Sequence, residues 1–492
     1  MKILKRLLVL TSFIVLQSCA STSIHKTDSS ILPVQKLQNE IYAVFSDSIM
    51  AQSNYSAMVK SMDNGDVLFS HNSQTLFHPA SNMKLLTTAT ALSRLGVNYF
   101  FRTLLTADSA AFTTTDTIIH GNLYLKGGGN PELELTDLLE MVDFMKSNSI
   151  RSITGDLIAD DTFLDSIRFG HGWMWDDDPA TYFPHLSALS LEKNVTKIIV
   201  TPGDSVGDTL KYQIIPYSPG FSMSNSGITI DTLLDYKLKV DRDWMAHRNH
   251  FEISGNYPIN AGPDTTWLNV ENPAIYTIST FYSLLQEAGI NIQGGYKRGV
   301  MPKSVDTLFV HKSDPLSLVI YNTNKVSDNL AAELILKTMA AEITDTTGTA
   351  KHGLTIIRQF LQEIGADSTT YRIVDGSGAS HYNLVTSDLM IQLLDHMYHK
   401  FNIKGEFLAS LPIGGVDGTL ERRMKSGKAF ENLRAKTGTV SGVSALSGYI
   451  STVDNEVLAF SILMQNFIGS SWPYRTLQDR VGEILANFSR MK

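Results

Sequence analysis

The sequence is poor in three features, and each shortage excludes a class of protein. One cysteine among 492 residues leaves no partner for a disulfide within the chain. Charged residues make up only 18% of the chain, the formal net charge is −8 and no basic stripe is visible, so nucleic acid is not an expected partner. After the N-terminal segment, no run is long and apolar enough to predict a membrane-spanning helix.

The N-terminus does carry a targeting signal. MKILKRLLVLTSFIVLQSCAS combines a basic start, a short apolar run and small residues, which is typical of a secretory signal. Leu16-Gln17-Ser18-Cys19 resembles a bacterial lipoprotein box, in which the signal is cut before a lipid-carrying cysteine. We therefore expect a signal at residues 1–19, lipidation of Cys19 on the periplasmic face of a membrane, and a polar tether at 20–33. The alternative is an ordinary cleaved signal with an accidental cysteine.

The pattern of predicted elements changes twice along the chain. Residues 34–97 predict a helix, a hairpin at Asn64-Gly65 and a second helix that stops at Gly96. Short β-like runs separated by Gly, Asp, Asn and Pro fill residues 98–307 and predict a β-rich insertion. Helical patterns return in 308–492, followed by three predicted strands and a final helix.

These patterns predict an α/β (α+β) protein in which 34–97 and 308–492 form one domain. The N-terminal hairpin and the last three strands would make one antiparallel, five-stranded sheet. The first and last helices would cover one face of this sheet and the central helices the other. The β-rich insertion would interrupt this domain.

Three short motifs occur in order in the two outer segments. They are Ser81-Asn82-Met83-Lys84 at a helix start, Ser327-Asp328-Asn329 before a helix, and Lys436-Thr437-Gly438 at a strand start. Each motif is weak alone, since Ser-x-x-Lys also begins at Ser23, Ser190 and Ser489. The ordered set singles out Ser81, because this set is typical of β-lactamases and penicillin-binding proteins.

The residue types suit acyl transfer. A serine hydroxyl needs a base, and Lys84 lies on the same helical face as Ser81. Lysine acts as a base only when its pKa falls, which burial and the nearby charge of Lys436 would both cause. Ser327 is a candidate proton relay, and Asn329 is expected to hold Lys84 and a substrate amide.

A substrate with a free terminal carboxylate fits the third motif. We expect the backbone N–H groups of Ser81 and Thr439 to bind the tetrahedral oxyanion. Lys436 with Thr437 or Thr439, along the strand that contains Gly438, would bind the carboxylate. Such a site would acylate Ser81 and release the last residue of a peptide.

The sequence resembles the class C penicillin-binding proteins, the D-alanyl-D-alanine carboxypeptidase/endopeptidase group, over residues 35–490. The segments that carry the resemblance are FHPASNMKLLTTATAL, LKGGGNPEL, GWMWDDDPATYFPHLSALSLEKN, VDGSGASHYNLV and LPIGGVDGTLERRM. It implies a transpeptidase-like domain with inserted domains and cleavage of D-Ala-D-Ala in peptidoglycan stem peptides, of cross-links, or both. It also implies that β-lactam antibiotics acylate Ser81 and that neither a metal nor an organic cofactor is needed.

Two positions depart from the family pattern. Asn130 stands where the family usually has aspartate, and His381 stands where it often has arginine. In some members that arginine helps to bind the carboxylate of the stem-peptide diamino acid, and an acidic residue near Asp160 or Asp161 would bind its amino group. The histidine leaves this preference open, since His381 could equally be a turn residue.

Three other functions are less consistent with the sequence. A β-lactamase of class A would need a glutamate-positioned water, and no Glu-x-x-x-Asn pattern lies between Asn329 and Lys436. A catalytically inactive, wall-binding lipoprotein on the same fold would need a damaged motif, and none of the three is damaged. A zinc hydrolase is disfavoured because His247 and His250 lack the glutamate of a zincin helix.

Overall fold

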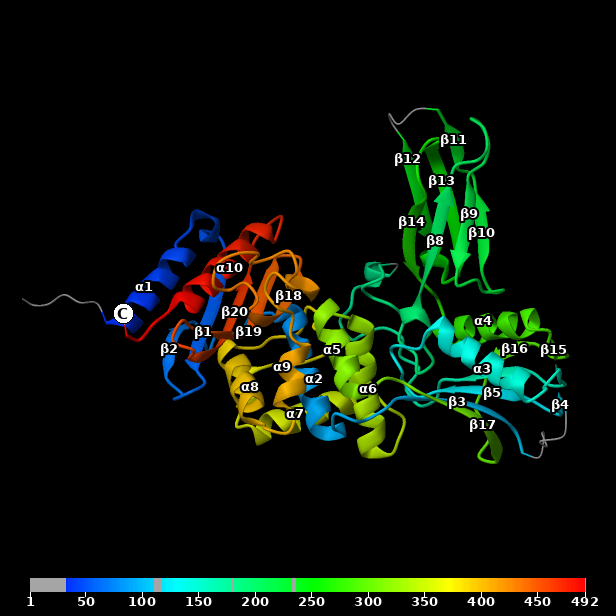
Figure 1. The fold of residues 1–492 in the computed structure, drawn as a ribbon, viewed down its shortest axis with the longest axis horizontal. Helices are drawn as coiled ribbons and strands as arrows, with labels where there is room; N and C mark the ends of the chain where they lie inside the picture. The colour runs from blue at the N-terminus through cyan, green and yellow to red at the C-terminus, as the bar shows by residue number, and fades with distance from the viewer. Residues whose placement is uncertain (1–31, 110–116, 179, 232–235, 492) are drawn as a thin grey trace, which may run out of the picture.

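The computed structural model describes residues 32–109, 117–178, 180–231 and 236–491. Cys19, the expected signal and almost all of the expected tether lie outside the described residues, so lipidation stays a prediction. Figure 1 shows the two outer segments of the chain folded together on the left and the inserted region on the right. Within the described residues, no helix has both the length and the apolar character needed to cross a membrane.

The two ends of the chain share one antiparallel sheet, in the order β18-β19-β20-β1-β2. Its strands are β1 (Asn54–Ser61), β2 (Val67–His71), β18 (Arg434–Val440), β19 (Val443–Ser451) and β20 (Val457–Gln465). Gly65, with φ +81°, turns the chain between β1 and β2, as the Asn-Gly pair predicts. The predicted five-stranded sheet is therefore confirmed.

Apolar side chains alternate between the two faces of this sheet. On β19, Leu446 and Ile450 join the apolar cluster under α1 and α10, whereas Ala445 and Tyr449 join the cluster under the central helices. The helices are α1 (Pro33–Phe45), α2 (Met83–Leu95), α5 (Leu316–Val326), α6 (Asn329–Thr344), α7 (Ala350–Glu363), α8 (Ser387–His399), α9 (Lys404–Ser410) and α10 (Trp472–Asn487). Both faces are thus covered as predicted (Figure 1).

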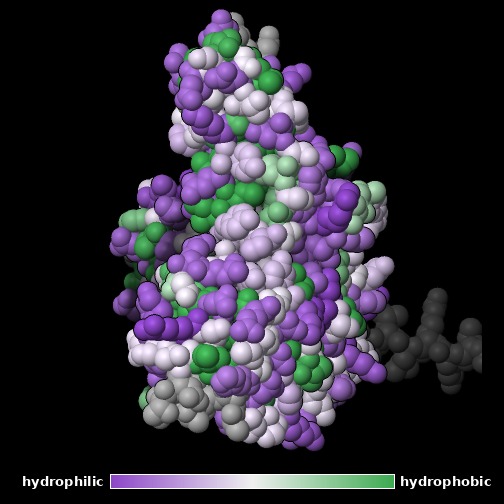
Figure 2. All heavy atoms as spheres, turned by 90° about the vertical axis from the view of Figure 1, so that its right-hand side faces the viewer, coloured by the Kyte–Doolittle hydropathy of each residue, from purple (hydrophilic) through white to green (hydrophobic). Residues whose placement is uncertain are grey.

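The inserted region contains two groups of strands. The lower group in Figure 1 consists of β3 (Arg102–Asp108), β4 (Ile118–Ile119), β5 (Leu123–Gly127), β6 (Ser152–Ile153), β7 (Leu157–Asp160), β15 (Asn291–Ile292), β16 (Tyr296–Arg298) and β17 (Val305–Lys312), with α3 (Leu135–Ser147) and α4 (Pro273–Glu287). The upper group consists of β8 (Val195–Thr201), β9 (Lys211–Ile215), β10 (Ser222–Asn225), β11 (Ile228–Ile230), β12 (Lys237–Arg242), β13 (His250–Pro258) and β14 (Asp264–Asn269). Viewed from the side of this region, hydrophobic residues lie in small groups among hydrophilic ones (Figure 2), as is usual for a surface in contact with water.

The sequence prediction for this region overlooked two helices and misplaced one end. The buried residues of α3, namely Leu138, Met141, Val142 and Met145, recur at helical spacing, and α4 is likewise apolar on its buried face. The predicted boundary at residue 307 falls inside β17, whose pairing with β3 extends to Lys312. We therefore propose that the chain returns to the transpeptidase-like part after Lys312.

Candidate active site

A cavity of about 640 Å³ lies between the transpeptidase-like part and the inserted region. One wall comes from the start of α2, the α5–α6 junction, the 378–381 loop and β18, and the other from residues 174–183 of the inserted region. The residues that line it include Ser81, Met174, Asp177, Tyr182, Ser327, Asn329, His381, Thr419, Arg423, Thr437, Thr439 and Arg475. Most of the sequence-predicted residues therefore meet in one cavity.

Lys84 is fully buried beside Ser81. Its Nζ lies 3.0 Å from Ser81 Oγ, and it donates hydrogen bonds to Asn329 Oδ1 at 2.6 Å and to the Ser377 carbonyl at 2.7 Å. Burial lowers the pKa of Lys84 to about 8, although the nearby carboxylates act in the opposite direction. A substantial fraction of neutral amine is therefore present near neutral pH, within reach of the serine proton.

A second buried lysine reaches the same region from β18. Lys436 Nζ donates to Ser327 Oγ at 2.9 Å, and Ser327 holds its position in the left-handed conformation, with φ +63°, at the end of α5. Burial, together with the charge of Lys84, pushes the pKa of Lys436 well below its ordinary value. The structure thus brings both lysines and both serines of the three motifs together, as predicted from their order.

The backbone around Ser81 is fitted closely against β18. A Cβ added at Gly438 would lie 2.8 Å from the Pro79 carbonyl oxygen, so this position needs glycine. Ala80 has φ +45°, an uncommon conformation for a residue with a side chain, and its N–H donates to Nδ1 of buried His78 at 2.9 Å. The strained turn is held by the histidine in front of it and the strand beside it, which together fix the position of Ser81.

Two arginines outside the three short motifs also line the cavity. Arg475 of α10 donates to Thr439 Oγ1 at 3.0 Å, and Thr437 Oγ1 donates to Thr419 Oγ1 at 2.7 Å. Arg423 also lines the cavity, and its guanidinium is paired with Asp479. Arg475 lies at the C-terminal end of the chain, and no local pattern marks it, so only its packing beside β18 reveals it. Hydroxyl groups and a guanidinium at one end of a cavity suit a carboxylate ligand.

The opposite wall belongs to the inserted region. Asn329 Nδ2 donates to the Tyr182 carbonyl at 2.7 Å. The inserted region therefore binds the N–H side of the amide that was expected to hold a substrate. Asp177 and His381 line the same cavity. Burial raises the pKa of the Asp177 carboxyl, and the charge of His381 opposes this. His381 is therefore a cavity residue and more than a turn.

Asp160 and Asp161 do not reach this cavity. Asp160 is buried and accepts hydrogen bonds from Thr162 and from the N–H of Met301. Asp161 forms a two-pronged ion pair with Arg298, at 2.8 and 2.9 Å. Both carboxylates thus have partners inside the inserted region, and Asp177 is the acidic residue on the cavity wall instead. The sequence showed it only as part of a run of three aspartates.

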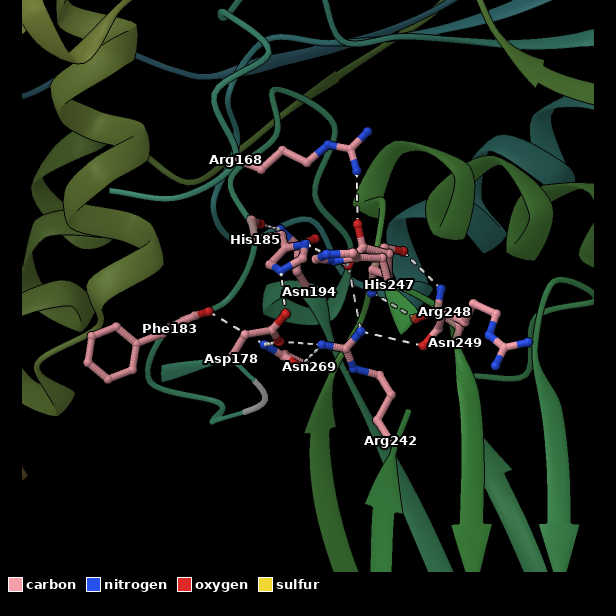
Figure 3. Close-up of polar contacts among 11 residues, drawn as sticks. Arg168, Asp178, Phe183, His185, Asn194, Arg242, His247, Arg248, Asn249 and Asn269 are labelled. Atoms are coloured by element: carbon pink, nitrogen blue, oxygen red, sulfur yellow. Dashed lines mark hydrogen bonds and ion pairs between the residues drawn. The ribbon is translucent and has the colours of Figure 1, made fainter. Parts of the chain in front are cut away.

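A buried polar network anchors the segment that contains Asp177 (Figure 3). Asp178 accepts hydrogen bonds from Arg242 of β12, from Asn269 at 3.0 Å and from His185 at 3.2 Å. Burial works to raise the pKa of Asp178, but the hydrogen bond from His185 and the charge of Arg242 outweigh it and lower this pKa to about 2. The upper group of strands therefore holds one wall of the cavity in place.

Comparisons with known proteins agree with this geometry. Residues 37–487 match the model of the D-Ala-D-Ala carboxypeptidase 3 (S13) family. A D-alanyl-D-alanine carboxypeptidase of Actinomadura sp. (strain R39) is 32% identical, and the match covers 94% of this chain and 86% of that protein. Penicillin binding protein 4 (dacB) from Haemophilus influenzae has a similar fold, with a TM-score of 0.78 at 22% identity over 92% of this chain and 99% of that one. A second structure of it, complexed with a novel β-lactam, gives a TM-score of 0.73 at 21% identity and covers 91% of this chain and 100% of that one. The chain therefore belongs to the D-Ala-D-Ala carboxypeptidase 3 (S13) family.

Proposed function

We propose that this protein cleaves D-Ala-D-Ala termini of peptidoglycan stem peptides, D-amino-acid cross-links, or both, through an acyl-enzyme on Ser81. The observation that carries the proposal is the 3.0 Å contact between Ser81 Oγ and the buried Nζ of Lys84, inside a cavity shared with Ser327, Asn329 and Thr437. Membership of the family supports the same reaction.

Acylation uses Lys84 as the general base. The neutral amine accepts the Ser81 proton while Oγ bonds to the substrate carbonyl carbon, and a tetrahedral oxyanion forms. The N–H groups of Ser81 and Thr439 are the proposed donors to this oxyanion. Collapse of the intermediate breaks the carbon–nitrogen bond and leaves the acyl-enzyme.

The leaving amine needs a proton. The protonated Lys84 supplies it, with Ser327 Oγ, which accepts a hydrogen bond from Lys436 Nζ at 2.9 Å, as the relay, and Lys84 is neutral again. Water then attacks the ester carbonyl with Lys84 as base, which releases the shortened peptide and restores the Ser81 hydroxyl. Every proton in this cycle is transferred between groups that line the cavity or lie directly under it.

The terminal carboxylate of the substrate would bind at the Thr437 and Thr439 hydroxyls, with the Arg475 guanidinium as its counter-charge. Lys436 is expected to act mainly through Ser327 and through the local positive potential, because its side chain is fully buried. Gly438 keeps this strand close to Ser81.

The stem-peptide side chain would meet Asp177 and His381 on the opposite wall. A carboxylate there can bind the amino group of a diamino acid, which is the role first expected near Asp160 or Asp161. His381 would contact the carboxylate of the same side chain when it is protonated.

β-Lactams would acylate Ser81 by the same chemistry, since opening of the lactam amide gives the same ester. The leaving nitrogen stays attached through the rest of the drug, which slows the attack of water. The β-lactam complex of the Haemophilus influenzae protein supports this proposal.

Because peptidoglycan lies outside the cytoplasm, an enzyme of this family is exported. We propose in addition that Cys19 carries lipid, that residues 20–33 tether the enzyme to the membrane and that the anchored enzyme works at the periplasmic face. Labelling with a radioactive fatty acid should mark the intact chain and be lost in Cys19→Ala.

Intact-protein mass after incubation with benzylpenicillin tests the nucleophile. The chain from residue 20 onward should gain one long-lived penicilloyl adduct, and Ser81→Ala should gain none. Hydrolysed drug without an adduct would indicate a β-lactamase instead. Intact drug with no adduct would indicate an inactive, wall-binding protein.

A further inference from the structure

Glu333 is a buried carboxylate that the three motifs do not include. It lies on α6, four residues after Asn329, and is only 1% exposed. Its Oε1 accepts hydrogen bonds from the N–H groups of Gly376 and Ser377, at 2.9 and 2.8 Å. Burying a carboxylate is costly, so its position beside the reactive groups requires an explanation.

The segment that Glu333 holds is bonded directly to Lys84. The Ser377 carbonyl accepts from Lys84 Nζ at 2.7 Å, and the Gly376 carbonyl accepts from Thr87 Oγ1 at 2.6 Å. Glu333 therefore fixes the N–H groups of two residues whose carbonyl groups accept hydrogen bonds from α2. Any shift of this segment would move one of the three hydrogen-bond partners of Lys84.

Two other carboxylates and a second lysine also face Lys84. Asp375 accepts from Trp173, Asn383 and several backbone N–H groups, and Asp328 is ion-paired with Lys193 at 3.0 Å. Lys436 faces Lys84 from β18, and burial together with the charge of Lys84 lowers the pKa of Lys436 well below its ordinary value. Glu333 is bonded to neutral N–H groups, so its negative charge is not neutralised by those partners.

We propose that Glu333 is a positioning residue for Lys84: it fixes the Ser377 carbonyl, and its charge sets the pH at which Lys84 can accept the Ser81 proton. This inference rests on the proposed role of Lys84 as base. Glu333 would then be a second buried group, besides Lys84, whose ionisation affects the rate of acylation.

The electrostatics agree with this geometry. Burial, with a further contribution from Asp375, raises the pKa of Glu333 to about 7. The pKa of Lys84 is about 8 because burial lowers it, and Glu333 is one of the carboxylates that limit this decrease. Removing the Glu333 charge should therefore lower the pKa of Lys84 further, so that the neutral amine persists to lower pH.

The test is the rate of penicillin acylation from pH 5 to 10 in Glu333→Gln, followed by intact mass. The amide oxygen can accept the same two N–H groups, so the change removes charge with little change in shape. We expect the acid limb of the profile to move down by about one pH unit, with the alkaline plateau reduced by no more than about fivefold. An unmoved limb, or an equal loss at every pH, would overturn the proposal.

Two further variants separate charge from position. Glu333→Asp keeps the charge and shortens the side chain, and Thr87→Val removes an uncharged contact to the same segment. In both variants the acid limb of the acylation profile should stay at the pH of the native enzyme, even if the rates change. If the limb of either variant shifts as far as that of Glu333→Gln, the position of the segment matters and the charge does not. Normal acylation by Lys84→Ala would instead refute the proposed base, which is a separate failure.

Discussion

The two walls of the cavity differ in nearly every physical property. On the transpeptidase-like side, Lys84 and Lys436 are 0% exposed, and hydrogen bonds of 3.0 Å or less connect them to the two motif serines. On the inserted side, the Tyr182 side chain is 74% exposed and Asp177 lies at the rim of the cavity. The two lysines of the first wall are buried, whereas Tyr182 on the second wall is open to solvent.

This difference indicates a division of labour. Buried lysines with lowered pKa values can transfer protons at neutral pH. The hydrogen bonds that Lys84 and Lys436 make offset part of the free-energy cost of burying them. An exposed wall cannot shift pKa values far, but it can contact whatever projects from the bound peptide. Substitutions of the buried lysines should therefore reduce the reaction itself, whereas those on the open wall should change which substrates are preferred.

The largest expected effect is that of Lys84→Ala. Losing a positioned general base costs about 10²–10⁴-fold, so acylation by benzylpenicillin should slow by roughly this factor, measured by stopped-flow or intact mass. Thermal unfolding should remain cooperative, which separates lost chemistry from lost structure. Acylation within tenfold of the native rate would remove Lys84 as the base.

An intermediate effect is expected for Arg475→Ala. A charged hydrogen bond is worth about 1.5–3 kcal/mol, so kcat/KM for a peptide ending in free D-Ala should fall by about 10–100-fold. The amidated peptide should be nearly unaffected, because it offers no carboxylate. Arg480→Ala on the same helix, whose side chain lies 3.6 Å from Asp47 and outside the cavity, is the matched control. Equal losses for both peptides would show that Arg475 only supports β18.

The sequence predicted the buried wall well and the open wall poorly, for a physical reason. Ser81 and Lys84 are neighbours on one helix, so their contact follows from local geometry alone, and the other two motifs supply fixed residue types at predictable places in the sheet. Asp177 lies in the cavity because the inserted region packs against distant segments of the chain, and Arg475 because α10 packs beside β18, 36 residues earlier; no local pattern encodes either contact. Asp160 and Asp161 looked equally suitable in the sequence, yet both carboxylates, at the end of β7 and just after it, bond to partners inside the inserted region.

The fold follows the same rule. Alternating apolar residues and the Asn64-Gly65 turn predicted the antiparallel sheet, since register and turn are local properties. The helices α3 and α4 were missed because short β-like runs surround them and dominated the composition of the region. The predicted end of the insertion at residue 307 falls inside β17, because β17 pairs with β3, a strand about 200 residues earlier.

The smallest effect, and the sharpest test of the open wall, is expected for Asp177→Asn. The substitution removes the charge that would bind the side-chain amino group of a diamino-acid stem peptide, at a site that water partly screens. We expect kcat/KM for that peptide to fall by about three- to tenfold, with penicillin acylation and a stem peptide lacking the amino group unchanged.

Asp176→Asn is the matched control, because this neighbour is exposed and does not line the cavity. If kcat/KM for the diamino-acid peptide falls by the same small factor in both variants, the effect comes from long-range charge. The inserted wall would then not select the side chain of the stem peptide. If Asp177→Asn also slows penicillin acylation, the two walls are coupled through the hydrogen bond from Asn329 to the Tyr182 carbonyl. The division between a reacting wall and a selecting wall would then fail, because the open wall would help to position the amide that holds Lys84.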